Sequence, residues 1–293
     1  MNDPSSPHLP TAGAALEWAG RELQHTESGS LIAQVLLSHI YRQPRCWTLA
    51  HPEFPLPPDR SAAYASLIRR VRGGEPLAYL TGFQEFFGLE FEVTPDVLIP
   101  RPETELLVGT ALEWLSEQPD QMERKPSAIR AVDLGTGSGC IAAAIAVHTP
   151  GLCVIAADIS AAALAVAARN FSRHGVRDRI RLLQGDLFTP LHGPVDLLCA
   201  NLPYALSDSL EGSPVVRFEP RLAVDGGPDG LRLVARAIEQ SAVRMAAGGL
   251  ALFELDAAHA DDARKLAKQV FPQAAVSVVK DLAGLDRLLA IRA

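Results

Sequence analysis

Four consecutive residues that follow an apolar run could hold a planar nitrogen for alkylation. The run 195–200 leads directly into Asn201, Leu202, Pro203 and Tyr204. The Asn201 side-chain oxygen and the Leu202 backbone carbonyl can accept both N–H groups of an amide or exocyclic amine. Pro203 restrains that backbone, and Tyr204 offers a flat face. Such a nitrogen is a poor nucleophile, so positioning and electrostatics would supply most of the catalysis. Asn201, Pro203 and Tyr204 are therefore candidate catalytic residues and 201–204 a candidate substrate site, although a structural turn would also fit.

A second apolar run ends near Asp133 and opens into a glycine-rich loop. The loop consists of Gly135, Thr136, Gly137, Ser138 and Gly139. Glycines at alternate positions let the backbone turn tightly and let a ligand lie against it, because no Cβ intrudes. The spacing GxGxG differs from the GxGxxG of dinucleotide-binding loops, and no lysine or arginine is near to suit a phosphate. The pattern favours a ligand with adenosine and amino-acid parts but no phosphates.

Two carboxylates follow at the ends of the next predicted strands. Asp158 lies about twenty residues beyond the loop, where a carboxylate can accept hydrogen bonds from both ribose hydroxyls. Its alternative role is to cap the helix that begins near Ser160. Asp186 could accept from an adenine amine and Leu187 could pack on the ring, but turn chemistry alone also explains this Gly-Asp pair.

The elements that must position these residues alternate between strands and helices. From residue 128 onward this pattern predicts a doubly wound α/β domain with a seven-stranded mixed sheet. The predicted strands are 129–134, 153–157, 180–183, 195–200, 249–254, 275–279 and 287–291, and the predicted helices are 139–148, 161–174, 230–247 and 260–271.

The chain before this sheet divides into further parts. Residues 1–84 have helical periodicity punctuated by prolines and predict a small helical domain. Residues 85–100 are aromatic and β-branched and predict a hairpin linker, which leaves 101–293 as the catalytic domain.

Composition restricts the function classes. The 293 residues carry 34 acidic and 27 basic side chains, for a net charge of −7, which disfavours a protein that binds nucleic acid by neutralising its backbone. No apolar window is long enough to span a membrane, and the N-terminus lacks signal-peptide features, so a cytoplasmic protein is predicted. The four cysteines form no CxxC pair, so neither a metal site nor disulfides are expected, and they are interpreted as small buried hydrophobes.

Taken in order, these motifs resemble the class I S-adenosylmethionine-dependent methyltransferases, and more narrowly the bacterial release factor glutamine methyltransferase (PrmC/HemK) family. The resemblance covers nearly the whole chain. It rests on the segments 74–82 (GEPLAYLTG), 99–105 (IPRPETE), 133–139, Asp158, 185–188, 201–204, 219–223 (EPRLA) and 226–231 (GGPDGL). Two positions depart from the family pattern. Leu202 stands where proline is usual, and Leu187 stands where some members have an aromatic residue.

The resemblance implies methyl transfer from S-adenosylmethionine to the side-chain amide nitrogen (N5) of the glutamine in the Gly-Gly-Gln motif of class I peptide chain release factors. It implies that 135–139, Asp158, Leu187 and Asn201 bind the cofactor, with Asp186 beside the adenine, and that 1–84 recognises the release factor. No metal, membrane or stable nucleic-acid partner is expected. The roles of Arg101, Glu103 and Glu105 stay open between a helix start and a wall of the site.

Three other functions are compatible with parts of this pattern. Glutamine methylation of a ribosomal protein uses the same chemistry. Adenine N6 methylation of nucleic acid is favoured by Leu202 but opposed by the acidic balance. A non-enzymatic adaptor would be expected to lack Asn201 or the glycine loop, and both are intact.

Overall fold

The structure is a computed structural model that describes residues 7–118, 129–210 and 216–293. The chain separates into two compact units, which divide between Gly82 and Phe83. Each unit has its own hydrophobic core.

The first unit is helical, as predicted. Its helices are α1 (Ala12–Glu22), α2 (Gly29–Tyr41), α3 (Arg45–Ala50), α4 (Pro58–Arg72) and α5 (Leu77–Thr81). Thr11 caps α1 by accepting a hydrogen bond from the backbone N–H of Ala14. The buried Tyr64 of α4 donates its hydroxyl to the Ala33 carbonyl of α2 at 3.0 Å. This bond satisfies the polar end of an aromatic side chain whose ring contributes to the core.

The second unit contains the predicted seven-stranded mixed sheet. Its strands are β3 (Ala131–Leu134), β4 (Val154–Asp158), β5 (Ile180–Gln184), β6 (Val195–Ala200), β9 (Met245–Glu254), β10 (Ala275–Lys280) and β11 (Asp286–Arg292). The order across the sheet is β10-β11-β9-β6-β3-β4-β5. The five strands from β9 to β5 are parallel, and β11 and β10 add in antiparallel fashion.

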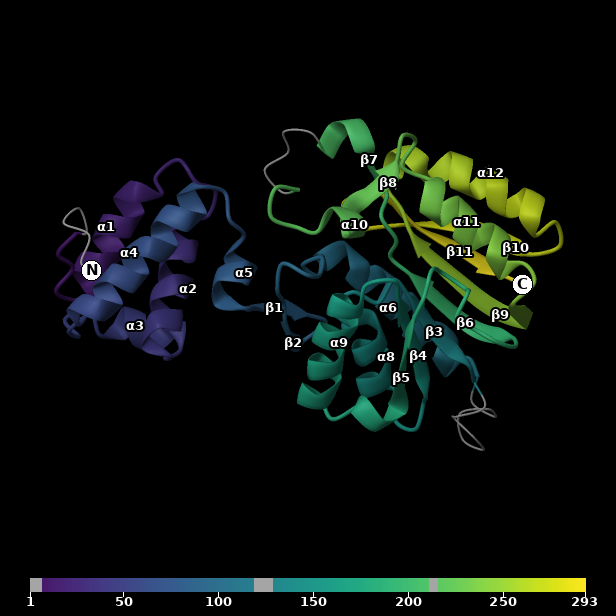
Figure 1. Cartoon of the computed structure of the whole chain (residues 1–293), viewed down its shortest axis with the longest axis horizontal. Coiled ribbons are helices and arrows are strands. Elements are labelled where there is room, and N and C mark those ends of the chain that lie inside the picture. The colour runs from purple at the N-terminus through teal and green to yellow at the C-terminus, as the bar shows by residue number, and fades with distance from the viewer. Residues whose placement is uncertain (1–6, 119–128, 211–215) are drawn as a thin grey trace. The chain divides into compact units, whose positions relative to one another are not determined.

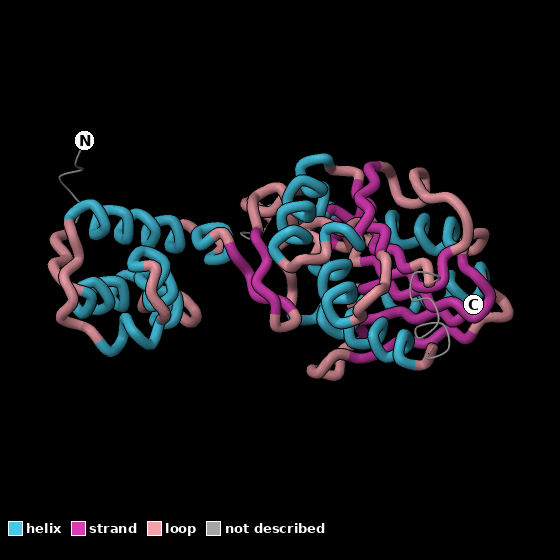
Figure 2. Tube along the Cα trace, turned by 90° about the horizontal axis from the view of Figure 1, so that it is seen from below, coloured by secondary structure: helices cyan, strands magenta, loops and turns pink. Residues whose placement is uncertain are grey.

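Helices cover both faces of this sheet (Figures 1 and 2). One layer is made by α6 (Glu105–Ser116), α8 (Cys140–His148) and α9 (Ala161–Arg173). The other is made by α11 (Arg232–Ser241) and α12 (Ala260–Val270). The two hydrophobic clusters lie on opposite sides of the strands, which explains why the parallel strands are nearly continuous apolar runs.

The predicted hairpin is present, but its strands begin earlier than expected, at β1 (Phe83–Phe86) and β2 (Leu89–Glu92). Phe86 and Phe91 are buried in the core of the second unit. Asn170 of α9 joins the hairpin to the glycine loop, since it exchanges two hydrogen bonds with the Glu92 backbone and donates a third to the Ser138 carbonyl. The hairpin therefore folds as part of the second unit, and its role as a linker stays a prediction.

Several local expectations differ from the structure. The helix expected over 230–247 ends at Ser241, because Met245 already pairs with Val195 at the start of β9. Cys140 and Cys199 are buried, but Cys46 and Cys153 are exposed, so the interpretation of all four as core residues was wrong. Short elements that were not predicted are η1 (Pro102–Thr104), η3 (Arg177–Arg179), β7 (Ala205–Leu206), η4 (Ser207–Leu210), α10 (Arg221–Val224), β8 (Asp225–Gly227) and η5 (Ala257–His259).

Replacing Gly139 by alanine should destabilise the second unit by about 2–3 kcal/mol. Gly139 has a φ of +82°, and an added Cβ would lie 2.5 Å from Phe171 Cε1 and 3.1 Å from Ala167 Cβ. Gly109→Ala is the matched control, because Gly109 lies within α6 and nothing is within 4 Å of its added Cβ. Calorimetry should show a lower Tm for Gly139→Ala and an equal or higher one for Gly109→Ala. Equal shifts for both would contradict the packing argument.

Candidate functional site

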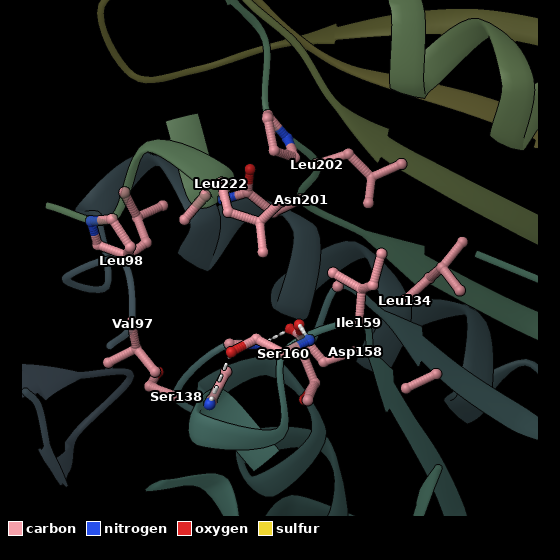
Figure 3. A pocket seen from close by; sticks show the side chains of 18 of the residues that line it. Val97, Leu98, Leu134, Ser138, Asp158, Ile159, Ser160, Asn201, Leu202 and Leu222 are labelled. Atoms are coloured by element: carbon pink, nitrogen blue, oxygen red, sulfur yellow. Dashed lines mark hydrogen bonds between the residues drawn. The ribbon is translucent and has the colours of Figure 1, made fainter. Parts of the chain in front are cut away.

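A pocket in the second unit opens where the parallel strands β3, β4, β5 and β6 end. Parallel strands present their carboxyl ends at one edge of a sheet, so the loops that follow them converge there. The pocket brings together the glycine loop, Asp158, Asp186 and Asn201. Figure 3 shows Asn201 and Leu202 across the pocket from Asp158 and Ser160. The predicted site residues from four separate strand ends are thus neighbours.

The glycine loop is held by the neighbouring strand. The backbone N–H groups of Gly135 and Thr136 both donate to the Ala157 carbonyl, at 2.8 and 3.0 Å. Gly135 has a φ of +73°, and an added Cβ would lie 2.9 Å from Leu202 Cδ2. A glycine is therefore required where the loop approaches the Asn201-Leu202 turn.

Asp133 supports this loop from inside the protein. The carboxylate is fully buried, and its Oδ2 accepts from the Thr136 hydroxyl at 2.6 Å and the Ala142 N–H at 3.1 Å. Burial raises the pKa of Asp133 to about 7, although these hydrogen bonds oppose the rise. Asp133 thus ties the loop to the start of α8.

Asp158 accepts one backbone hydrogen bond on each carboxylate oxygen. Gly137 N–H donates to Oδ2 at 2.9 Å, and Ser160 N–H donates to Oδ1 at 2.8 Å. Burial raises the pKa of Asp158, and the hydrogen bonds from Ser160 and Gly137 act against this rise. The alternative that Asp158 caps α9 was wrong, because Ser160 is the N-cap and accepts from Ala163 N–H. Asp158 therefore remains available to a ligand in the pocket.

The other predicted cofactor residues are placed differently from one another. Asp186 and Leu187 both line the pocket. Asp186 Oδ2 also forms an ion pair with Arg236 at 2.7 Å. Leu187 is buried, and its backbone has a positive φ of +48°. Thr136, Gly137 and Ser138 line it too. Gly139 is not among the described lining residues, and its contacts with Phe171 account for the glycine.

The Asn201 side chain has a defined orientation. Its Nδ2 donates to the Thr104 hydroxyl at 3.0 Å, whereas its Oδ1 makes no hydrogen bond to any residue that the structure describes. Leu202 and Pro203 line the pocket beside it. Tyr204 is not among the described lining residues, and its hydroxyl bonds to Glu254 Oε1 at 3.3 Å. The amide thus leaves a free acceptor at the site.

The segment 99–105 supplies contacts to three parts of this unit. Arg101 donates to Glu219 Oε2 at 2.6 Å, and Ile99 N–H donates to Glu219 Oε1 at 3.2 Å. Thr104 holds Asn201, and Glu105 accepts from Phe87 N–H in the hairpin at 2.8 Å. Arg101 thus stands at the wall of the pocket, whereas Glu105 begins α6 and holds the hairpin.

Sequence reasoning missed Asn170 and Glu254 and left Thr104 and Glu219 within motifs without a role. Glu254 carried a usable signal, since it ends an apolar strand as Asp158 does. Thr104, Asn170 and Glu219 carried none, because their partners lie 97, 78 and 118 residues away.

The charges that line the pocket suit a cationic ligand. Three carboxylates, those of Asp96, Asp158 and Asp186, face one arginine, Arg101, which is already paired with Glu219. Among the described residues, no group of three or more metal-ligating side chains is found. Within the same ranges, no helix is long and apolar enough to cross a bilayer.

Family models match both parts of the chain. The model described as PrmC N-terminal domain matches residues 14–82, and the one described as Methyltransferase small domain matches residues 115–217.

Curated relatives match the chain over most of its length. A release factor glutamine methyltransferase from Bordetella pertussis is 42% identical over 264 residues, covering 88% of this chain and 93% of the relative. One from Moorella thermoacetica is 42% identical over 263 residues, covering 89% and 90%. One from Nitratidesulfovibrio vulgaris is 37% identical over 302 residues, covering 100% and 98%.

Solved structures share the fold. The catalytic domain of hMettl16, determined with MAT2A 3'UTR hairpin 6, superposes with a TM-score of 0.55 at 16% identity and covers 74% of this chain and 80% of that one. The N-terminal domain of human METTL16 with SAH superposes with a TM-score of 0.50 at 18% identity, covering 70% and 76%. At these identities the likeness concerns the fold alone.

Proposed function

The chain belongs to the release factor glutamine methyltransferase family, and from this premise we propose that it methylates the side-chain amide nitrogen (N5) of the glutamine in the Gly-Gly-Gln motif of class I peptide chain release factors. The methyl donor is S-adenosylmethionine. The observation that carries the proposal is the free Asn201 Oδ1 at the carboxyl end of β6, beside a pocket suited to a cation.

The residues of the pocket fit this donor. The glycine loop leaves space against its backbone, and the three lining carboxylates suit a ligand with a positive sulfonium and ammonium group better than a phosphate. Asp158 would accept from the ribose hydroxyls, and Asp186 and Leu187 would contact the adenine. When bound, S-adenosylmethionine supplies an electrophilic methyl group on sulfur.

The chain's own residues would position the acceptor nitrogen. Asn201 Oδ1 and the Leu202 carbonyl would accept the two N–H groups of the substrate amide and turn its nitrogen toward the methyl group. Because the nitrogen becomes acidic once it is alkylated, no base is needed before transfer. Catalysis then depends on alignment and on the acceptors that are already oriented. Leu202 retains its carbonyl, so the departure from proline leaves this role intact.

The remaining parts of the chain would serve recognition. We assign residues 1–84 to binding of the release factor, 85–100 to the linker and 101–293 to catalysis. The relatives act, by their names, on release factors, which function in translation, and this supports a cytoplasmic location.

Peptide mass spectrometry after incubation with methyl-labelled cofactor tests the proposed function. A purified class I release factor should gain one labelled methyl group on the Gly-Gly-Gln glutamine. A release factor with that glutamine replaced by alanine should gain none, and an adenine-containing RNA should stay unlabelled. Label on the RNA, or label on the release factor whose glutamine is replaced by alanine, would reject the assignment in favour of another methyl acceptor.

A further inference from the structure

The short helix α10 brings an exposed leucine to the pocket. Leu222 lines the pocket, and it is 58% exposed. Figure 3 shows it on the same side of the pocket as Asn201, across from Asp158 and Ser160. Single exposed leucines are common on protein surfaces, so exposure alone assigns no role. Leu222 differs from such residues because both ends of α10 are joined to segments that hold or adjoin Asn201.

The start of α10 is fixed by Glu219. Its side chain is fully buried, and its Oε1 accepts from Ile99 N–H at 3.2 Å while its Oε2 accepts from Arg101 at 2.6 Å. The segment that contains Ile99 and Arg101 continues to Thr104, whose hydroxyl accepts from Asn201 Nδ2. Charge-assisted hydrogen bonds to a buried carboxylate keep the groups they join in one geometry. The start of α10 is therefore fixed relative to the segment that orients the Asn201 amide.

The end of α10 is attached to the chain that follows Asn201. The strand β8 comes directly after α10 and pairs in parallel with β7, so that Asp225 lies opposite Ala205. Gly226 lies so close to this chain that an added Cβ would be 2.6 Å from Tyr204 Cα. The helix thus has little freedom to move away from the residues that would hold the acceptor amide.

The side chains that this segment presents to the pocket are all apolar. Its lining residues are Pro220, Leu222 and Ala223. Such a surface offers no hydrogen bond to a ribose or to an amino acid group, whereas Asp158 on the opposite side can accept from both. It suits the methylene groups of a glutamine side chain and the Cα atoms of glycines. The apolar wall therefore favours the methyl acceptor over the methyl donor as its ligand.

We propose that Leu222 is a specificity-determining residue that packs on the Gly-Gly-Gln segment of the release factor when its glutamine enters the pocket beside Asn201. This inference rests on the proposed function and deepens it, because it assigns an apolar contact to the acceptor segment. The glycine before the glutamine has no side chain, so a leucine can lie directly against its backbone. Binding removes the exposed surface of Leu222 from water and excludes water from the reacting amide.

Steady-state kinetics with Leu222 variants of the full chain test this contact. Leu222→Ala should raise KM for a purified class I release factor about tenfold, because the shorter side chain buries less apolar surface on the bound segment. The kcat should stay within about threefold, since a contact made equally before and during methyl transfer affects binding alone. Leu222→Met should stay within about twofold of wild type, whereas the polar Leu222→Asn should resemble Leu222→Ala.

Leu285→Ala is the matched control. Leu285 is 50% exposed and is not among the described residues that line the pocket. Its replacement should leave KM and kcat unchanged, and neither leucine-to-alanine variant should shift the Tm by more than about 2 °C, because both side chains are largely exposed. The Kd for S-adenosylhomocysteine, measured by calorimetry, should stay within about threefold of wild type in every variant.

A second substrate tests whether Leu222 faces the glycine. A release factor with alanine in place of the glycine before the glutamine should lose a larger factor in kcat/KM with the wild-type enzyme than with Leu222→Ala. The reason is that the smaller side chain leaves room for the added methyl group. Equal losses with the two enzymes would overturn the inference, because a residue that only supports the fold would not distinguish the two substrates.

The remaining outcomes separate this inference from the proposed function. A wild-type enzyme that labels the glutamine, together with an unchanged KM in Leu222→Ala, would overturn the inference alone. A Kd for S-adenosylhomocysteine weakened about tenfold in Leu222→Ala would also overturn it, because Leu222 would then belong to the donor site. An equal rise of KM in Leu285→Ala would have the same consequence. A wild-type enzyme that labels no glutamine would reject the proposed function and this inference with it.

Discussion

Replacing Asn201 by alanine should lower kcat for release factor methylation by about 10²-fold, the scale of removing one positioned polar group from an active site. The Asn201 side chain is held by Thr104 and leaves Oδ1 free at the pocket. Alanine removes that acceptor, so the substrate nitrogen loses one of the two contacts that orient it. Single-turnover kinetics with saturating cofactor would measure the loss.

The effect should appear in kcat rather than in cofactor affinity. The Kd for S-adenosylhomocysteine should change by less than about threefold, because the loss concerns a contact to the acceptor amide. Gln273→Ala is a suitable control, since it removes an exposed side-chain amide outside the pocket. Asn201→Asp keeps an acceptor but cannot donate to Thr104, so it should also be slow. Turnover close to wild type in Asn201→Ala would refute the central assignment.

Replacing Asp158 by alanine should weaken cofactor binding by about 10- to 100-fold. A hydrogen bond to an ionised group contributes about 1.5–3 kcal/mol, which is this range in Kd. Both oxygens already accept a backbone N–H, which orients the carboxylate toward the pocket. Calorimetric titration with S-adenosylhomocysteine would measure the change, and kcat at saturating cofactor should fall much less.

Asp256→Ala is the matched control for this variant. Asp256 accepts from the N–H of Ala258, two residues ahead, just as Asp158 accepts from Ser160, but it is not among the described residues that line the pocket. Its replacement should leave the Kd unchanged. An unaltered Kd in Asp158→Ala would remove the ribose assignment. A large drop in Tm without a change in Kd would assign Asp158 to the support of the glycine loop instead.

Sequence patterns were sufficient for the sheet and for the edge at which the site forms. Each parallel strand is a short apolar run with a polar residue at its last position or within one residue of it, as at Asp133, Asp158 and Asn201. Parallel strands align their carboxyl ends, so residues that occupy the same place in successive repeats become neighbours. This rule needs only local patterns and the strand order of a doubly wound sheet.

Exposure and element boundaries were less predictable. Cys46 and Cys153 lie beside apolar runs but are exposed, because burial depends on what packs against a position. The helix expected to reach residue 247 gives way to β9, where pairing with β6 outweighs helix propensity. The glycine at 139 is explained by a phenylalanine 32 positions later, not by its motif alone.

The sequence by itself determined the strands, the glycine loop, the candidate acceptor Asn201 and two of the three carboxylates that line the pocket, Asp158 and Asp186. Only the tertiary structure decided which side chains orient them. Thr104 meets Asn201, Glu219 meets Arg101, and Glu254 meets Tyr204. The physical reason is the sequence separation of the interacting residues. A strand or a loop depends on neighbouring residues, whereas a hydrogen bond between distant segments depends on the register and packing of the whole unit.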